Sequence, residues 1–220
     1  MEKYIISVPR ADFSLDSLLS ALHVVRENDL VEEIEAMYLE AVEIAKPKAV
    51  YALLSPELRD GEIWLDNFCI QEPFVYKMIS ANKVVVPYIA TCGKEVEEWS
   101  RSYTEVYDQF IADSVKQVCL FVIREKLFDE VKSRYFDTEC HLSTINPGSL
   151  KEWPLSGQIP LFGLLGNVEN DIGVTLGESL LMSPTKSVSG IMFPTAEVYH
   201  NCQLCPRSDC PNRRSPFKCR

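Results

Sequence analysis

The sequence predicts a single α+β domain followed by a short cysteine-rich tail. Stretches with the three- and four-residue apolar spacing of helices alternate with short apolar runs between turn residues, a pattern typical of strands. No internal repeat or low-complexity linker interrupts the chain before residue 200. An apolar fraction of 46% with 25% charged residues is ordinary for one globular domain. We therefore assign residues 1–200 to the domain and residues 201–220 to the tail.

The first hundred residues are predicted to alternate between helices and short strands. The clearest helix covers 30–45, where apolar residues recur every three or four positions until Pro47 stops it. Two apolar runs, 49–54 and 84–90, have the length and composition of buried strands. The other elements predicted here are helices over 15–23 and 72–81, a strand over 62–65 and a helix that begins at 95–98.

The longest predicted helix covers 103–135. Apolar residues keep helical spacing along it without an interrupting glycine or proline, either as one helix or as two that join near Arg124 and Glu125. Cys119 lies on the apolar stripe and is predicted to be a core residue. His23 and His141 have no partner cluster in the sequence, so we predict structural roles for both.

The character of the sequence changes at residue 146. Residues 146–154 are rich in turn formers, 155–165 have the pattern of a short amphipathic helix, and 167–170 have that of a loop. Further on, 172–182 and 183–193 combine β-branched and apolar residues between turn signals. We predict two strands there, around a loop at 183–186.

The net charge of −10 is unevenly distributed. Residues 202–220 hold five basic residues and one acidic residue, so the tail carries +4 and the body about −14. An acidic body argues against a nucleic-acid partner. No apolar run approaches the roughly 18 to 20 residues that cross a bilayer, and the N-terminus lacks the pattern of a signal peptide. We therefore expect a cytoplasmic, reduced protein without membrane or nucleic-acid partners.

The tail contains four of the eight cysteines, and we predict that they bind a metal: Cys202, Cys205, Cys210 and Cys219. Thiolates at short spacing suit zinc or an iron–sulfur cluster, because a short loop lets them converge on one centre. Structural zinc generally uses two Cys-x-x-Cys pairs and the tail has one, so we favour the cluster and keep zinc as the alternative. His200 could replace Cys219, which is the penultimate residue.

Several motifs follow one another in the last part of the domain. They are Asn146-Pro147-Gly148, Trp153-Pro154-Leu155, the stretch 172–176, Glu178-Ser179 and Lys186-Ser187-Val188-Ser189-Gly190. Together with residues 41–49 and 90–96, this series resembles the activation domain of cobalamin-dependent methionine synthase. The resemblance covers most of residues 30–199 and is strongest to stand-alone forms of that domain.

The resemblance implies a curved domain with a central antiparallel sheet and flanking helices. It also implies that the domain binds S-adenosylmethionine in a groove and helps to return an oxidised cobalamin to its methylated form. The cobalamin is held by a partner, either a corrinoid-binding protein or the methionine synthase core. The residues implied to contact the cofactor are Pro147, Gly148, Glu178, Lys186, Ser187 and Tyr199.

Two positions depart from the family pattern. Thr144 and Ser149 stand where the family has an arginine and a tyrosine that hold the cofactor's carboxylate and adenosine. A threonine hydroxyl cannot replace a guanidinium, because the charge and one of two hydrogen bonds are lost. Tyr199 then becomes the best remaining aromatic candidate, with an anchor for the strand end as its alternative role.

Two functions are compatible with these features. In the first, the domain takes part in the reductive reactivation of a corrinoid methyltransferase, and a cluster in the tail relays the electron, since the sequence offers no flavin site. In the second, the domain is a non-catalytic docking module for a corrinoid protein or methyltransferase, and the tail holds structural zinc. An ordinary hydrolase or transferase is disfavoured, because the sequence has no Ser-His-Asp arrangement, no phosphate-binding glycine loop and no paired acidic motif with a placed histidine.

Overall fold

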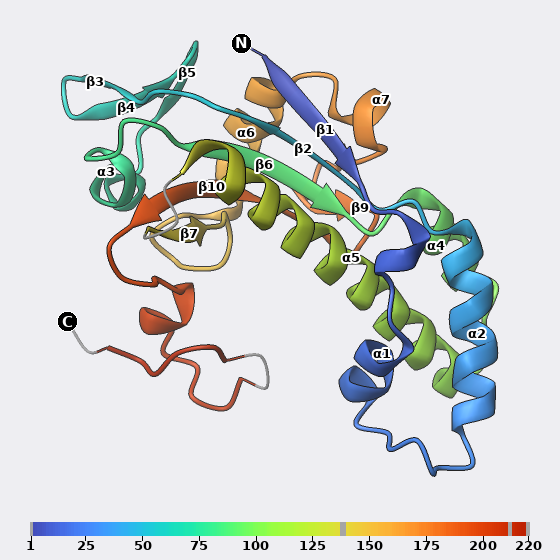
Figure 1. Cartoon of the computed structure of the whole chain (residues 1–220). Coiled ribbons are helices and arrows are strands. Elements are labelled where there is room, and N and C mark those ends of the chain that lie inside the picture. Colours follow the sequence, from blue (N-terminus) through green and yellow to red (C-terminus); the bar gives the residue numbers. More distant parts are fainter. Residues whose placement is uncertain (1, 137–139, 211–212, 219–220) are drawn as a thin grey trace.

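The centre of the fold is a five-stranded antiparallel sheet, seen in a computed structural model that describes residues 2–136, 140–210 and 213–218 (Figure 1). The strands lie in the order β1 (Lys3–Ser7), β2 (Lys48–Ala52), β6 (Val86–Thr91), β10 (Ser187–Thr195) and β7 (His141–Ile145). β6 is buried along its whole length between β2 and β10. The predicted α+β class with a central antiparallel sheet is confirmed.

The register between β10 and β7 leaves one part of β10 open. β7 ends at Ile145, which lies opposite Ile191, and the chain turns away at residues 146–149. On this side, no described strand pairs with 187–190, the first residues of β10. Asn146 satisfies part of this edge, because its Nδ2 donates a hydrogen bond to the Ser189 carbonyl at 2.8 Å.

Alternate residues of the sheet face two different layers, as the two-residue period of strands requires. Tyr51, Tyr88 and Met192 share a core with α5 (Val106–Tyr135). Val50 and Ile89 point to the opposite face, where α6 (Gln158–Leu165) and α7 (Val168–Ile172) cover them. The sheet is therefore covered by helices on both faces (Figure 1).

α5 is one continuous helix, so the alternative of a break near Arg124 and Glu125 is wrong. Its apolar stripe, from Ile111 to Val131, is buried against the sheet and against three other helices. Cys119 lies on that stripe and is 1% exposed, which confirms the prediction that it is a core residue.

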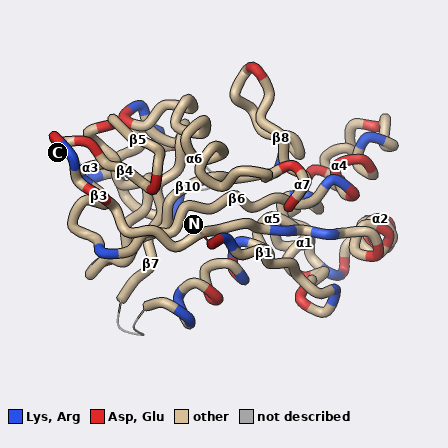
Figure 2. The backbone as a smooth tube through the Cα atoms, turned by 90° about the horizontal axis from the view of Figure 1, so that it is seen from above, with Lys and Arg blue, Asp and Glu red and all other residues tan. Residues whose placement is uncertain are grey.

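Three helices gather around the N-terminal half of α5 (Figure 1). They are α1 (Leu15–Leu22), α2 (Val31–Ile44) and α4 (Lys94–Ser100). His23 ends α1 in the left-handed conformation, with φ 56°, and its backbone N–H bonds to the carbonyls of Leu19 and Ser20. α2 and α4 carry many of the acidic residues of the body (Figure 2).

A small sheet packs at the other end of the domain. Its strands are β3 (Glu57–Arg59), β4 (Glu62–Leu65) and β5 (Phe68–Ile70), and α3 (Pro73–Ile79) follows them. Ile63 and Ile79 share a core with Trp153 and with the outer residues of β10, so this end is continuous with the main domain. The tail begins beside this core, at a 3₁₀ turn over Asn201–Gln203.

Most elements lie where the sequence predicts them, and two predictions are wrong. Residues 167–170 are predicted as a loop but begin α7, because Val168 and Ile172 are buried against the sheet. The strand predicted over 172–182 is only β8 (Thr175–Leu176), which pairs with β9 (Met182–Ser183). Between them lies an exposed turn that ends at Leu180, with φ 61°.

Candidate functional site

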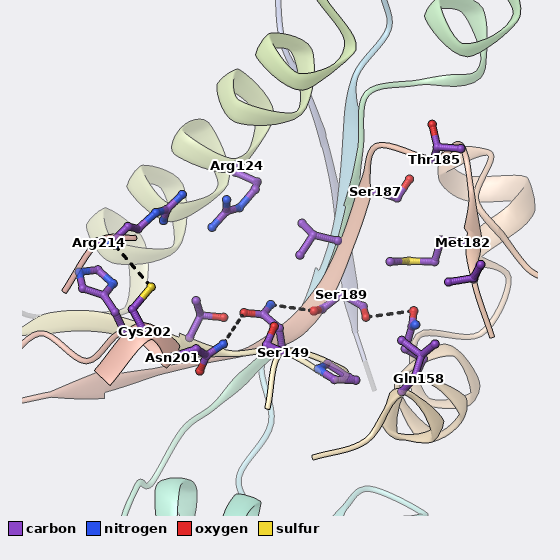
Figure 3. A pocket seen from close by; sticks show the side chains of 17 residues that line it. Arg124, Ser149, Gln158, Met182, Thr185, Ser187, Ser189, Asn201, Cys202 and Arg214 are labelled. Atoms are coloured by element: carbon purple, nitrogen blue, oxygen red, sulfur yellow. Dashed lines mark hydrogen bonds between the residues drawn. The ribbon is translucent and has the colours of Figure 1, made fainter. Parts of the chain in front are cut away.

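A pocket of about 550 Å³ opens beside the unpaired start of β10 (Figure 3). Its walls come from α5, from the turn after β7, from the start of α6, from the loop before β9 and from the tail. Leu155, Leu181, Met182 and Val188 make part of the lining apolar. This volume lies in the range of small-molecule sites, about 300 to 1,000 Å³.

Hydrogen bonds that polar side chains make with one another and with backbone carbonyls form the floor of the pocket. Asn146 Nδ2 donates to the Tyr88 hydroxyl at 3.0 Å as well as to the Ser189 carbonyl. The Ser189 hydroxyl donates to Gln158 Oε1 at 3.3 Å (Figure 3). Gln158 Nε2 donates to the Leu180 carbonyl at 2.8 Å. The network fixes the turn after β7, the start of α6 and the loop before β9 in one arrangement.

Gly190 is required by the closeness of this floor. A Cβ atom at this position would lie 2.4 Å from Asn146 Nδ2 and 2.6 Å from the Ile145 carbonyl oxygen. Both distances are shorter than van der Waals contact, so no other residue fits without moving β7. The glycine of the Lys-Ser-Val-Ser-Gly motif therefore lets the end of β7 approach β10.

The tail forms one wall of the pocket. Asn201 Nδ2 donates to Asn146 Oδ1 at 3.3 Å, and the Tyr199 backbone N–H donates to the Ser143 hydroxyl at 3.0 Å. Arg213 holds the rest of the tail together, because its guanidinium donates to several backbone carbonyls, among them those of Cys202 at 3.0 Å and Cys205 at 2.9 Å.

A buried ion pair fixes the loop at the other side of the pocket. Lys116 Nζ lies 3.4 Å from Glu97 Oε2, and both side chains are less than a tenth exposed. The Thr185 hydroxyl donates to the same Glu97 oxygen at 2.9 Å. Burial alone would raise the pKa of Glu97, but the Thr185 hydrogen bonds and the Lys116 charge outweigh it and lower that pKa.

The charged side chains that line the pocket are basic. Arg124 enters from α5 and Arg214 from the tail (Figure 3). His200 also lines the pocket. No aspartate or glutamate is among the described lining residues. The pKa of His200 is lowered, first by burial and then by the charge of Arg214. In a chain of net charge −10, this pocket is thus a local region of positive charge.

The structure brings several of the predicted cofactor residues to this pocket. Pro147 and Ser187 line it, and Gly148 continues the turn beside it with φ +79°. Thr144 and Ser149, the two departures from the family pattern, line it as well. The Thr144 and Tyr88 hydroxyl oxygens lie 3.2 Å apart, so the threonine is tied into the floor network.

Three other predicted cofactor residues lie outside the lining of this pocket. Glu178 is exposed in the turn between β8 and β9. Lys186 Nζ is paired with Asp113 on α5, 2.8 Å from Oδ2. Tyr199 is half-buried against the core that contains Trp153. The individual residue assignments stay predictions.

Arg124 and Arg214 are the lining residues that sequence reasoning missed. Arg124 stands inside a long helical pattern where nothing distinguishes it from a solvent-exposed arginine. Arg214 is one of five basic residues in the tail, and no motif distinguishes it from the others. Only the fold brings these two positions to the same pocket.

The described part of the tail contains three of its four cysteines, Cys202, Cys205 and Cys210. Cys202 lines the pocket, and its sulfur accepts a hydrogen bond from the Arg214 N–H at 3.4 Å. Cys205 packs against the core that contains Trp153. Cys219 lies outside the described residues, and among those described no three His, Cys, Asp or Glu side chains gather as a metal site would require. The metal centre stays a prediction.

Within the described ranges, no helix has both the length and the hydropathy needed to cross a membrane.

The antiparallel sheet and the helices on both of its faces define an α+β domain with a polar pocket at the open edge of its sheet. Comparison with solved structures gives a match to the "MetH Reactivation Domain bound to AdoHcy", with a TM-score of 0.66 and 13% sequence identity over 91% of this chain and 81% of that one. No family model and no curated protein matches the sequence. The chain therefore has the fold of the MetH reactivation domain.

Proposed function

We propose that this protein is a reactivation domain for a corrinoid-dependent methyltransferase and that its pocket holds S-adenosylmethionine or the demethylated product. The observation that carries the proposal is the position of the pocket. In a fold similar to one crystallised with AdoHcy, a cavity of about 550 Å³ opens at the motifs that predicted this ligand. The corrinoid itself belongs to the partner, a corrinoid-binding protein or the methionine synthase core.

The lining residues fit most of such a ligand. The apolar side chains of Leu155, Leu181 and Met182 suit an adenosyl group, and Gln158 and Asn201 offer amide groups to its polar edge. The basic side chains suit a carboxylate. No acidic side chain of the described lining faces the positive sulfonium of S-adenosylmethionine, so we expect the uncharged thioether of S-adenosylhomocysteine to bind at least as tightly.

S-adenosylmethionine supplies a methyl group in this reaction. The role we assign to the chain is to hold and orient the donor and to exclude water around it. Asn146, Ser189 and Gln158 are suited to this role, because their mutual hydrogen bonds fix their positions before the ligand arrives. The loop held by Thr185 and Glu97 provides a second rigid edge.

A blocking variant tests the binding site. Ser149 is exposed at the pocket, so Ser149→Trp would fill the space without disturbing the core. Lys151→Trp places the same side chain two residues further on, at a position that does not line this pocket. In calorimetric titration with S-adenosylhomocysteine, we expect at least tenfold weaker binding for Ser149→Trp and wild-type affinity for Lys151→Trp. Equal affinities for all three proteins would refute the location.

A second function is favoured by a specific observation. Thr144 and Ser149 line the pocket where the family has an arginine and a tyrosine, which weakens the case for cofactor binding. In this alternative the domain is a non-catalytic docking module for a corrinoid protein or methyltransferase, with structural zinc in its tail. No binding of S-adenosylmethionine or S-adenosylhomocysteine at millimolar concentration would leave this docking function.

The proposal includes an iron–sulfur cluster at Cys202, Cys205, Cys210 and Cys219 as the electron carrier. Its support is the cysteine spacing together with the place of Cys202 in the lining of the pocket. Anaerobic purification followed by iron, sulfide and zinc analysis tests it. Iron and sulfide in stoichiometric amounts would support the relay, whereas colourless protein with one zinc per chain would leave a structural tail.

A further inference from the structure

Two arginines at the pocket have no carboxylate partner among the described residues. Arg10, Arg26, Arg59, Arg101, Arg134 and Arg207 each form an ion pair with an acidic side chain. Arg213 instead donates to backbone carbonyls of the tail. Only Arg124 and Arg214 among the described arginines have neither kind of partner for their guanidinium groups, and both line the same pocket.

Arg124 is held in position by aromatic side chains. Its guanidinium carbon lies 6.0 Å from the centroid of the Phe128 ring, and Phe128 packs edge-on against Tyr88 with ring centroids 6.4 Å apart. The Tyr88 hydroxyl contacts Thr144 and Asn146 in the pocket floor. Arg124 Nε is buried and makes no hydrogen bond. A buried donor without an acceptor is destabilising, so a ligand oxygen that accepts a hydrogen bond from it would be stabilised.

Arg214 is positioned by the fold of the tail. It follows Arg213, whose guanidinium joins the carbonyls of Cys202 and Cys205, and its own N–H donates to the Cys202 sulfur. In Figure 3 its side chain extends into the pocket toward the side formed by α5, where Arg124 also enters. The two guanidinium groups thus come from elements far apart in the sequence.

Like charges that share a pocket repel one another, and the described lining has no acidic residue to offset them. An oxyanion between them would remove the repulsion and accept charge-assisted hydrogen bonds from both guanidinium groups. We propose that Arg124 and Arg214 form an oxyanion subsite that takes a carboxylate or phosphate group of the ligand, and that the tail is a wall of the ligand site. These arginines supply from α5 and the tail the charge that Thr144 cannot supply from β7.

The identity of the oxyanion as the carboxylate of an adenosyl amino acid rests on the proposed function, but the subsite itself does not. Two ligands separate the contribution of the carboxylate to binding from that of the adenosyl group. S-adenosylhomocysteine carries the carboxylate, and 5′-methylthioadenosine keeps the adenosyl thioether without it. The two arginines should therefore strengthen the binding of S-adenosylhomocysteine and leave that of 5′-methylthioadenosine unchanged.

Calorimetric titration of Arg124→Gln and Arg214→Gln tests the subsite. Each substitution keeps a polar side chain and removes one charge, so we expect S-adenosylhomocysteine to bind about tenfold more weakly to each variant. We expect 5′-methylthioadenosine to bind to both variants with wild-type affinity. Arg207→Gln is the matched control, because Arg207 is also a tail arginine but pairs with Asp209 and does not line the pocket. Wild-type affinity of both pocket variants for S-adenosylhomocysteine would overturn the subsite.

Inorganic pyrophosphate, titrated in parallel, separates the two proposals. If neither adenosyl compound binds but pyrophosphate binds to the wild type and is weakened by either pocket substitution, the oxyanion subsite stands and the adenosyl ligand is rejected. If the adenosyl compounds and pyrophosphate all fail to bind to the wild type, the oxyanion subsite is rejected. Thermal unfolding at the wild-type temperature confirms that each variant is folded.

Discussion

The sheet domain and the tail are stabilised by different interactions. The domain buries long apolar stripes from α5 and the strands, so its stability comes mainly from area removed from water. The tail buries little, and Arg213 joins its backbone carbonyls while Leu204 and Cys205 provide its contact with the core. Apolar burial resists local opening, whereas a few directional hydrogen bonds at a surface do not. We therefore expect the pocket to have one rigid wall and one that opens separately.

The largest effect should come from the rigid wall, at Gly190. In Gly190→Ala the added Cβ would lie 2.6 Å from the Ile145 carbonyl oxygen, so β7 must move away from β10. We expect unfolding free energy to fall by about 3 kcal/mol, since overpacked sites of this kind generally lose 1 to 3 kcal/mol or more. Urea unfolding followed by circular dichroism measures this loss.

Gly177→Ala is the matched control for that substitution. Its Cβ would have no neighbour closer than 3.5 Å, in the exposed turn between β8 and β9. We expect a change within about 0.5 kcal/mol. Equal destabilisation by both substitutions would mean that the approach of β7 to β10 is less tight than the geometry indicates.

The next largest effect is expected at the ion pair of Glu97 and Lys116. Glu97→Gln removes the buried one of the two carboxylates near the Lys116 ammonium and leaves Asp113, whose Oδ1 lies 3.6 Å away and which is half-exposed. We expect a loss of about 2 kcal/mol in unfolding free energy at pH 7. Because folding lowers the pKa of Glu97 from its ordinary value of 4.5, the wild type gains stability above that pH and loses it as pH falls through the folded pKa.

Urea unfolding of wild type and Glu97→Gln at several values from pH 7 to pH 3 checks the predicted direction of the pH dependence. The difference in unfolding free energy between wild type and Glu97→Gln should be constant at pH 6 to 7 and should shrink steadily below about pH 5. Glu98→Gln, at the adjacent residue on α4, has no ion pair among the described contacts and serves as control. A difference that grows on acidification would contradict the assigned role.

The elements with strong periodicity could be predicted from the sequence, and the pocket could be predicted only in part. In α2 and α5 the buried face requires apolar residues every three or four positions, and the fully buried β6 requires a continuous apolar run. Both patterns can be seen in the sequence. β7 was missed because it is a short strand whose burial alternates and whose partner β10 lies far along the chain. The end of β7 creates the open edge of β10, so the local sequence pattern could not predict the geometry of the pocket.

The site residues also fall into two groups, those that belong to a sequence motif and those that only the fold brings to the pocket. Pro147 and Ser187 belong to motifs, and the resemblance brought them to attention. Arg124 has no local signature, because its significance comes from Phe128 and Tyr88 beneath it and from the tail opposite it. Contacts between distant segments carry no periodic signal in the sequence.

A smaller effect on global stability is expected from the tail. Arg213→Ala removes the hydrogen bonds to the Cys202 and Cys205 carbonyls but leaves the sheet untouched. We expect the unfolding free energy of the domain to change by less than about 0.5 kcal/mol, while the tail opens more often. Limited chymotrypsin digestion should cleave after Leu204 about tenfold faster than in the wild type. Arg207→Ala should behave as wild type, and equal cleavage of both variants would remove the assigned role of Arg213.

The smallest effect on stability, and the sharpest contrast between the two regions, should come from thiol modification. Burial raises the pKa of the Cys92 thiol to about 12 and also raises that of Cys119, so both stay protonated and inaccessible at pH 8. Cys202 and Cys210 are half-exposed, and we expect iodoacetamide to modify them in the folded, metal-free protein at least a hundredfold faster than the two core thiols. Peptide mass spectrometry after timed quenching measures each rate of modification. Modification should leave the unfolding temperature of the domain unchanged, because the tail contributes little to it.

Labelling of Cys119 as fast as Cys210 would mean that the domain opens as readily as the tail. If protein prepared anaerobically resists labelling at Cys202 and Cys210 until a chelator is added, a metal holds the tail closed, and the difference in opening between the two walls disappears in the metal-bound form.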